Sequence, residues 1–183
     1  IEDNKKSLIT IATIIIVLVV GFFAYKYWYV AGQETEAQSK MFKAEQYFEK
    51  DSLTQALNGD KENMGFLQII DNYSITPSGN LAQYYAGICC LKQSNYQAAI
   101  DHLKEFDGDD QIVGPQATGA IGDANMQLGK TDEAIPSYLK AAEQNNNDFT
   151  TPIFLKKAAM ANEFKKNYAD ALKLFKRIKN EFP

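Results

Sequence analysis

The sequence contains few of the residues from which metal and catalytic sites are usually built. Its 183 residues include two cysteines, Cys89 and Cys90, and a single histidine, His102. Adjacent cysteines on one helix point in different directions, so they predict small buried side chains rather than a disulfide or a metal site. No glycine-rich phosphate loop or nucleophile elbow is present either. The sequence therefore predicts a protein without cofactor or metal that is not an enzyme.

Basic residues are too few to predict a nucleic-acid partner. The formal net charge is −4, whereas proteins bind phosphate backbones through clustered lysine and arginine. The acidic stretch 107–110 lacks the ligand spacing and closing glutamate of an EF-hand, so it indicates a turn rather than a calcium site. The acidity indicates a soluble surface for the part of the chain outside the apolar run.

One long apolar run, residues 8–29, is charged only at Lys26. Because a helix of roughly 20 apolar residues crosses the hydrocarbon of a bilayer, we expect one transmembrane helix over this range. Aromatic residues near its end predict an interfacial belt: Phe22, Phe23, Tyr25, Tyr27, Trp28 and Tyr29. The alternative is a cleaved signal peptide, but the run is long and bulky aromatics occupy the place of a small-residue cleavage site.

The flanking charges predict the orientation of this helix. Lys5 and Lys6 precede the run, while Glu34 and Glu36 follow it. By the positive-inside bias, residues 1–7 form a cytoplasmic N-terminal end and the rest of the chain crosses the membrane.

A pattern with a period of about 35 residues begins at Asn80. Equivalent positions of its three units are Gly87, Tyr96, Ala99, Ile100, Leu103 and Phe106; Gly122, Thr131, Ala134, Ile135, Tyr138 and Ala141; and Ala159, Tyr168, Ala171, Leu172, Phe175 and Ile178. This spacing resembles the tetratricopeptide repeat, a helix-turn-helix unit of about 34 residues that closes on a proline, here Pro183. We therefore expect an all-α fold in which an N-terminal transmembrane helix leads into a tetratricopeptide-repeat α-solenoid.

A divergent unit is expected before these three. Residues 34–50 carry an apolar stripe near helical spacing, and Asn58-Gly59-Asp60 interrupts the pattern. Gly65 and Ile69 then resume the repeat. We expect a helical linker and a divergent first unit over residues 30–79, and three complete units over residues 80–183.

Small and bulky positions alternate for a steric reason. Glycine at Gly87 and Gly122 lets the two helices of a unit approach closely, whereas Leu103 and Tyr138 fill the space between neighbouring units. Gly129 follows the first helix of its unit and can take the left-handed conformation that a tight turn requires.

The first helix of each unit is expected to line the concave face of the curved solenoid. In register, this face presents Tyr84, Ile88, Leu91, Lys92, Gln116, Asp123, Met126, Gln127, Lys156, Met160 and Glu163. We predict that these residues bind protein, because Leu91, Met126 and Met160 offer adaptable apolar contacts among polar groups that can pair with a peptide backbone. The alternative for Met126 and Met160 is packing against a neighbouring helix.

A short lysine-bearing end, one span and an acidic repeat domain together resemble the YfgM-like ancillary subunits of the Sec translocon. The stretches KAEQYFEKDSLTQALNGD, FLQIIDNY, NLAQYYAGICCL and FTTPIFLKKAA are similar to the form of this family in Bacteroidota. The resemblance implies a non-enzymatic holdase or adaptor in the bacterial inner membrane with its repeats in the periplasm. The implied partners are the SecYEG translocon, a peptidyl-prolyl isomerase-type chaperone of the PpiD kind and emerging secretory polypeptides.

Two other functions fit the same pattern. An envelope-assembly or cell-division scaffold would use the solenoid to hold outer-membrane or peptidoglycan machinery, and the proteins that copurify after gentle detergent extraction would identify it. An enzyme subunit whose catalytic residues come from a partner would show activity only on reconstitution.

Overall fold

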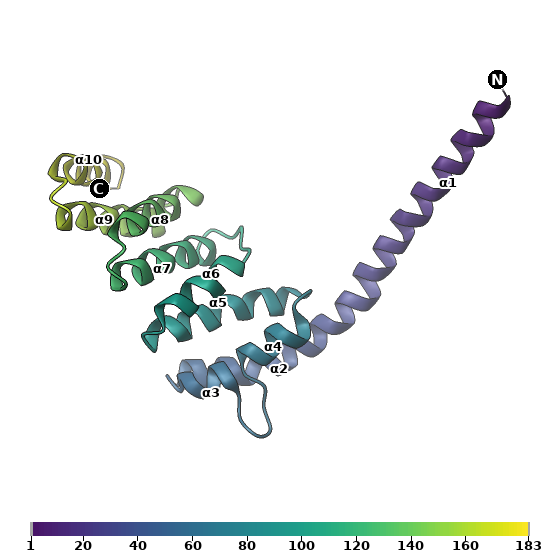
Figure 1. Ribbon diagram of the computed structural model, residues 1–183, viewed down its shortest axis with the longest axis horizontal. Coiled ribbons are helices and arrows are strands. Elements are labelled where there is room, and N and C mark those ends of the chain that lie inside the picture. The colour runs from purple at the N-terminus through teal and green to yellow at the C-terminus, as the bar shows by residue number, and fades with distance from the viewer. Residues whose placement is uncertain (1, 183) are drawn as a thin grey trace.

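The chain forms a long N-terminal helix that leads into a stack of shorter helices (Figure 1). The computed structural model describes residues 2–182, with side chains for residue 7 and residues 9–182. Within this range all regular structure is helical, so the predicted all-α solenoid is confirmed. Pro183 and the side chains of Lys5 and Lys6, on which two of the predictions rest, lie outside the described part.

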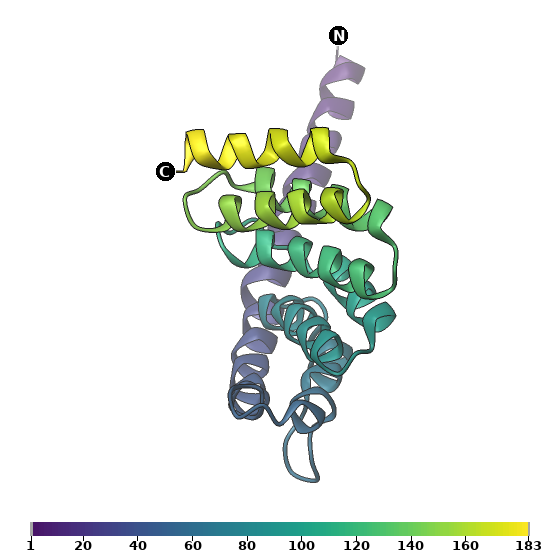
Figure 2. The same cartoon turned by 90° about the vertical axis from the view of Figure 1, so that its left-hand side faces the viewer.

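The helices pair from α5 onward, α5 with α6, α7 with α8, and α9 with α10, and the pairs stack on one another (Figure 2). In chain order the helices are α1 (Glu2–Ala24), the π-helical turn η1 (Tyr25–Val30), α2 (Ala31–Glu49), α3 (Leu53–Asn58), α4 (Phe66–Tyr73), α5 (Pro77–Lys92), α6 (Tyr96–Glu105), α7 (Val113–Gln127), α8 (Thr131–Gln144), α9 (Thr150–Phe164) and α10 (Tyr168–Glu181). Each pair from α5 is one helix-turn-helix unit, and the first begins at Pro77 rather than at Asn80.

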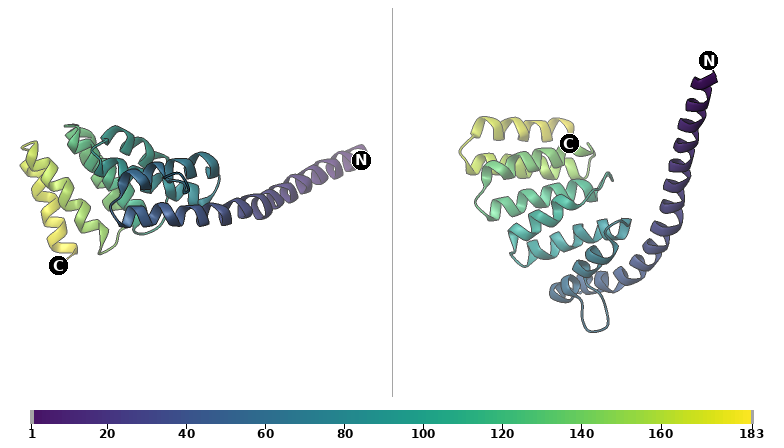
Figure 3. Two further views of the ribbon diagram at one scale, coloured as in Figure 1. Left: turned by 90° about the horizontal axis from the view of Figure 1, so that it is seen from below. Right: turned by 45° about the vertical axis from the view of Figure 1, so that its right-hand side comes forward.

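Helices α1 and α2 are parts of one continuous helix, joined through η1 (Figure 3). From Ile9 this helix is long and apolar enough to cross a membrane, and none of the apolar stretch is buried against protein. In the π-helical turn the rings of Tyr25 and Tyr29 stack with their centroids 5.4 Å apart. Such turns are rare in α-helices and bend them locally. The apolar helix therefore runs directly into the solenoid without a flexible linker.

Glu34, in the first turn of α2, binds the N-terminus of α5. Its carboxylate accepts hydrogen bonds from the backbone N–H of Ser78 at 2.9 Å and from the Ser78 hydroxyl at 2.8 Å. Thr76 caps the same helix end by accepting from the N–H of Gly79 at 3.0 Å. A negative charge at a helix N-terminus is favourable because the first N–H groups lack partners within the helix. These contacts fix how α2 meets the first complete unit.

The same tight turn connects the first and second helices of every unit. Asp51, Ser94, Gly129 and Lys166 each occupy the left-handed region, with φ of 56°, 63°, 73° and 63°. The prediction for Gly129 is confirmed, and the other three show that residues with side chains accept the same conformation. In each turn the next residue donates its N–H to a carbonyl five positions earlier, as in a Schellman motif: Ser52 to Tyr47, Asn95 to Cys90, Lys130 to Asn125, and Asn167 to Asn162.

The second helix of the divergent unit is broken into α3 and α4 by the loop 59–65. The pattern predicted an interruption at Asn58-Gly59-Asp60, but not the short helix α3 before it. Asp60 organises the loop, because its carboxylate accepts from the backbone N–H groups of Glu62 and Asn63, both at 2.8 Å, and from the Tyr47 hydroxyl. These hydrogen bonds, that of Tyr47 foremost, hold the pKa of Asp60 well below its usual range.

The loop is therefore expected to resist acid. An unfolded aspartate titrates near pH 4, so the Asp60 carboxylate stabilises the loop fully above that value, and this stabilisation is lost as the pH falls through the lowered folded pKa. A carbon-13 titration of the carboxyl group should show no midpoint down to about pH 3. The Tyr47→Phe variant should move the midpoint up towards its usual value, and an ordinary midpoint in the unmodified protein would contradict this account.

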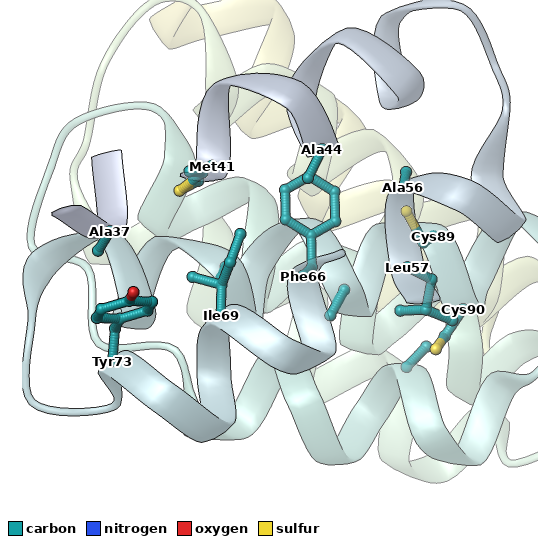
Figure 4. Packing of buried hydrophobic residues seen from close by; sticks show 13 residues of the cluster. Ala37, Met41, Ala44, Ala56, Leu57, Phe66, Ile69, Tyr73, Cys89 and Cys90 are labelled. Atoms are coloured by element: carbon teal, nitrogen blue, oxygen red, sulfur yellow. The ribbon is translucent and has the colours of Figure 1, made fainter. Parts of the chain in front are cut away.

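Three hydrophobic clusters follow one another along the stack and form the core. The largest joins α2, α3, α4 and α5 around Phe66 and Ile69, both fully buried (Figure 4). The close helix contacts are confirmed, since a Cβ added at Gly87 would lie 2.5 Å from Leu103 Cγ and one at Gly122 would lie 2.5 Å from Tyr138 Cε1. Leu103 and Tyr138 also pack against the following unit, as the spacing predicted.

Candidate functional site

A groove of about 640 Å³ opens where the first helices of the three complete units lie side by side. Helices α5, α7 and α9 supply most of its wall, and α6 and α8 each add a tyrosine. The lining consists of Leu91, Tyr96, Asp123, Met126, Gln127, Tyr138, Lys157, Met160, Ala161 and Phe164. The groove exists because the repeats bring equivalent positions of successive first helices next to one another.

A neutralised charge pair lies in the groove wall. The Lys157 ammonium is 2.7 and 2.8 Å from the two carboxylate oxygens of Asp123, and the Tyr138 hydroxyl donates to Asp123 at 2.8 Å. Lys157 also lies 5.8 Å from the centroid of the Tyr138 ring and 5.7 Å from that of Phe154, within reach of cation–π attraction. Burial and the adjacent Asp123 carboxylate raise the pKa of Tyr138, so its hydroxyl stays a donor.

Apolar side chains border this pair and face solvent. Met160 is 53 % exposed and Phe164 is 73 % exposed, while Leu91 and Met126 are half-buried. Because the charges in the wall already satisfy one another, a ligand gains little from bringing a charge of its own. It gains by covering apolar surface, which makes the groove suited to an apolar segment.

A scan against models of protein families matches residues 66–111 and 120–183 to the tetratricopeptide repeat. The chain belongs to the tetratricopeptide-repeat family. The match begins at α4 and covers more than half of the sequence. A search among curated proteins finds no match.

Tetratricopeptide repeats are scaffolds for protein–protein interaction, and their stacking produces extended concave surfaces for that purpose. The groove of this tetratricopeptide-repeat protein is such a surface. The protein is therefore an interaction scaffold that carries one N-terminal helix long and apolar enough to span a membrane.

Five of the residues predicted for the concave face lie in the groove: Leu91, Asp123, Met126, Gln127 and Met160. They come from three helices and are brought together by the stacking of the repeats. Met126 was predicted either to line the concave face or to pack against a neighbouring helix. It does both, because it lines the groove and also packs against the cluster around Tyr138 and Phe154. That these residues bind a protein stays a prediction.

Three predicted residues serve instead to join neighbouring units. Tyr84 and Ile88 are half-buried against the cluster formed by Leu103 with α7, and neither lines the groove. Lys92 reaches back to the divergent unit, where its ammonium lies 2.6 Å from Asp51. Positions that face the next repeat and positions that face the groove are adjacent on a first helix, and the repeat pattern does not separate them.

The other three predicted residues, Gln116, Lys156 and Glu163, are exposed and lie outside the groove lining. Lys156 was predicted to line the concave face, but its neighbour Lys157 lines the groove instead. One residue turns a helix by about 100°, since an α-helix has 3.6 residues per turn, so a register error of one position exchanges a groove residue for a solvent-exposed one.

The prediction missed five groove residues: Tyr96, Tyr138, Lys157, Ala161 and Phe164. Tyr96 and Tyr138 were assigned to repeat positions in the second helices, and both line the groove from there. The Tyr138 hydroxyl contacts Asp123. A signal for Lys157 exists in the sequence, because it follows Asp123 by 34 positions, one repeat length. Opposite charges one repeat apart on first helices are candidates for an ion pair between units.

The residues that the sequence excluded from chemistry have structural roles. Cys89 and Cys90 are buried and free, and burial raises the pKa of Cys89 to about 12, which leaves its thiol unreactive. Asp110 accepts from the backbone N–H groups of Ile112 at 2.8 Å and Gly114 at 3.1 Å, so the acidic stretch is a turn that begins α7, as predicted. In the part of the chain with described side chains, no cluster of potential metal ligands occurs.

Proposed function

We propose that the protein is a membrane-anchored, non-enzymatic adaptor whose groove holds an apolar segment of another polypeptide. The proposal rests on one observation. The exposed side chains of Met160 and Phe164 lie in the same groove wall as Asp123 and Lys157, whose charges neutralise each other. The continuous helix from α1 to α2 supports the anchored arrangement, since it would hold the groove close to the bilayer.

We further propose that the adaptor works beside the SecYEG translocon. In this arrangement α1 crosses the bacterial inner membrane with its N-terminus in the cytoplasm, and the solenoid lies in the periplasm. The partner in the groove is a PpiD-type chaperone or an emerging secretory polypeptide. The resemblance to YfgM-like subunits and the lysines that precede the span support this assignment.

Photo-crosslinking in cells tests the assignment with two reporter positions in the full chain. A photoreactive residue at Phe164 samples the groove, and one at Val19 samples the apolar helix. Crosslinks from Phe164 to a chaperone or a secretory polypeptide, together with crosslinks from Val19 to a translocon subunit, are expected. Crosslinks from Phe164 to outer-membrane or peptidoglycan proteins would replace this assignment with an envelope scaffold.

The Met160→Asp variant should lower the yield of groove crosslinks by about tenfold. A carboxylate at this position would have to lose water under an apolar partner, and pairing with Lys156 or Lys157 one turn earlier would not restore the apolar surface that is lost. Ile153→Asp is the matched control, because Ile153 lies on the same helix, is 45 % exposed and does not line the groove. Equal yields from the two variants would refute the groove as the binding surface.

A further inference from the structure

Charge is divided unevenly along the solenoid. Residues 150–183 contain eight lysines and arginines against three acidic residues, a formal charge of +5, so the remaining chain carries −9 of the total of −4. The basic part coincides with the last unit, α9 and α10. This unit is thus basic whereas the residues before it are acidic, and the two parts should favour surroundings of opposite charge.

One face of α10 combines apolar and basic side chains at helical spacing. Tyr168 is 64 % exposed and Leu172 is 54 % exposed, and Lys176 and Lys179 continue the same stripe. We call these four residues the α10 face. The opposite side of the helix is occupied, because Leu174 and Ile178 pack against the cluster of α8 and α9.

The lysines of this face form no ion pair within residues 2–182, unlike Lys173 and Arg177 of the same helix. Lys173 pairs with Asp170 at 3.0 Å and Arg177 pairs with Glu181 at 3.0 Å, whereas Lys176 and Lys179 form no ion pair there. Their charge is available to an anionic surface.

The solenoid carries α10 to the same side of α2 and α3 as the apolar helix, although α10 and the N-terminus lie at opposite ends of the longest axis (Figure 1). In Figures 1 and 2, and in the right panel of Figure 3, α1 and α10 lie on the same side of α2 and α3. If α1 crosses a bilayer, the stack therefore rises from α2 towards the plane of that bilayer, with α10 placed to the side of the span (Figure 1).

We propose that the α10 face rests on anionic phospholipid headgroups of the membrane that α1 crosses. Lysines attract an anionic surface while an exposed aromatic and a leucine enter the headgroup region, which is how amphipathic helices bind membranes. The solenoid is then attached to the membrane at two places, through α1 and through the α10 face, and its acidic middle units remain in water. This inference rests on the proposed membrane span.

A lipid surface is favoured over the acidic units of a second copy by the placement of the helix. The span keeps α10 of the same chain permanently within reach of the bilayer, so docking needs no second molecule. Repulsion between the acidic middle units and anionic lipid also leaves the basic end as the part of the solenoid that approaches the surface.

Fluorescence quenching in nanodiscs tests the proposal with the full chain. Trp28 is the single tryptophan and lies in the aromatic stretch of the helix, so it reports on the span itself. The double variant Trp28→Phe/Tyr168→Trp moves the reporter to the α10 face. Nanodiscs contain phosphatidylglycerol or phosphatidylcholine, with or without bromine near the headgroup end of the acyl chains.

Brominated phosphatidylglycerol should quench both reporters, and brominated phosphatidylcholine should quench Trp28 alone. Adding Lys176→Gln and Lys179→Gln to the double variant should lower the docking equilibrium by about 25-fold, since each lysine at an anionic surface contributes roughly fivefold. Adding Lys130→Gln and Lys140→Gln makes the same charge change on exposed lysines of the preceding unit and should leave quenching unchanged.

The remaining outcomes separate the two proposals. Quenching of Trp28 without quenching at position 168 overturns the docking of α10 and leaves the span in place. No quenching of Trp28 overturns the span and the docking with it. A reporter at position 168 that is shielded from aqueous acrylamide but untouched by bromine identifies contact with a second copy, which also overturns the lipid proposal.

Discussion

Replacing Phe66 with alanine is expected to lower the free energy of unfolding by about 4 kcal/mol, the largest effect of any single change considered for this protein. Phe66 is fully buried at the start of α4 (Figure 4). Its ring stacks on Tyr85 at a centroid distance of 5.0 Å and meets Phe48 edge-on at 6.4 Å. The variant loses both ring contacts and leaves a cavity, because three helices meet there and none can move inward alone.

Guanidinium denaturation of the full chain in detergent, followed by circular dichroism, measures this effect. Phe42→Ala is the matched control, because Phe42 lies on α2 but is 61 % exposed and is not part of the cluster. Its loss should cost less than about 0.5 kcal/mol. Similar shifts for the two variants would mean that the divergent unit does not pack around Phe66.

Replacing Gly79 with alanine is expected to cost about 3 kcal/mol, although it adds only one methyl group. A Cβ at this position would lie 2.0 Å from the carbonyl oxygen of Tyr73 and 2.7 Å from its carbonyl carbon. These are backbone atoms at the end of α4, and the same oxygen accepts hydrogen bonds from the N–H of Thr76 at 3.0 Å and its hydroxyl at 2.8 Å. Because no side chain can rotate away, α4 and α5 must separate.

Gly32→Ala provides the comparison for this variant. Gly32 lies within α2 with nothing inside 4 Å of an added Cβ, so alanine should stabilise the helix by up to about 1 kcal/mol. The same denaturation experiment then gives opposite signs for one chemical change at two glycines. A Gly79→Ala variant as stable as the unmodified protein would show that α4 and α5 are not in close backbone contact.

Both changes act at the junction between the apolar helix and the repeats. Phe66 and Gly79 hold α4 against α2 and α5, and Glu34 binds the N-terminus of α5 from the side. Loosening this junction leaves the last three pairs stacked but frees their orientation relative to α1. The groove crosslinks and the docking of α10 therefore depend on the junction in different ways, since only the second requires a fixed direction of the solenoid.

The pairs of helices were predictable because each repeat position has a local steric cause. Gly87 and Gly122 must be small where Leu103 and Tyr138 cross them, and this requirement recurs in the sequence at one repeat length. The groove residues were predictable only in part, because this steric cause acts within a unit and does not fix how neighbouring units are rotated. The pattern identifies first helices, but it does not tell whether Tyr84 faces the next unit or Met160 faces the groove, since that depends on how far each unit is rotated on its neighbour.

The amino-acid pattern alone predicts the apolar helix, the all-α architecture and the existence of stacked helix pairs, because each follows from short-range periodicity and from the sizes of side chains. The folded chain was needed to show that Lys157 rather than Lys156 meets Asp123, that Tyr96 and Tyr138 reach the groove, and that the basic α10 lies on the same side of α2 and α3 as α1. Small rotations between successive units add up along a solenoid, so the direction of its last helix is a property of the whole stack and of no single segment.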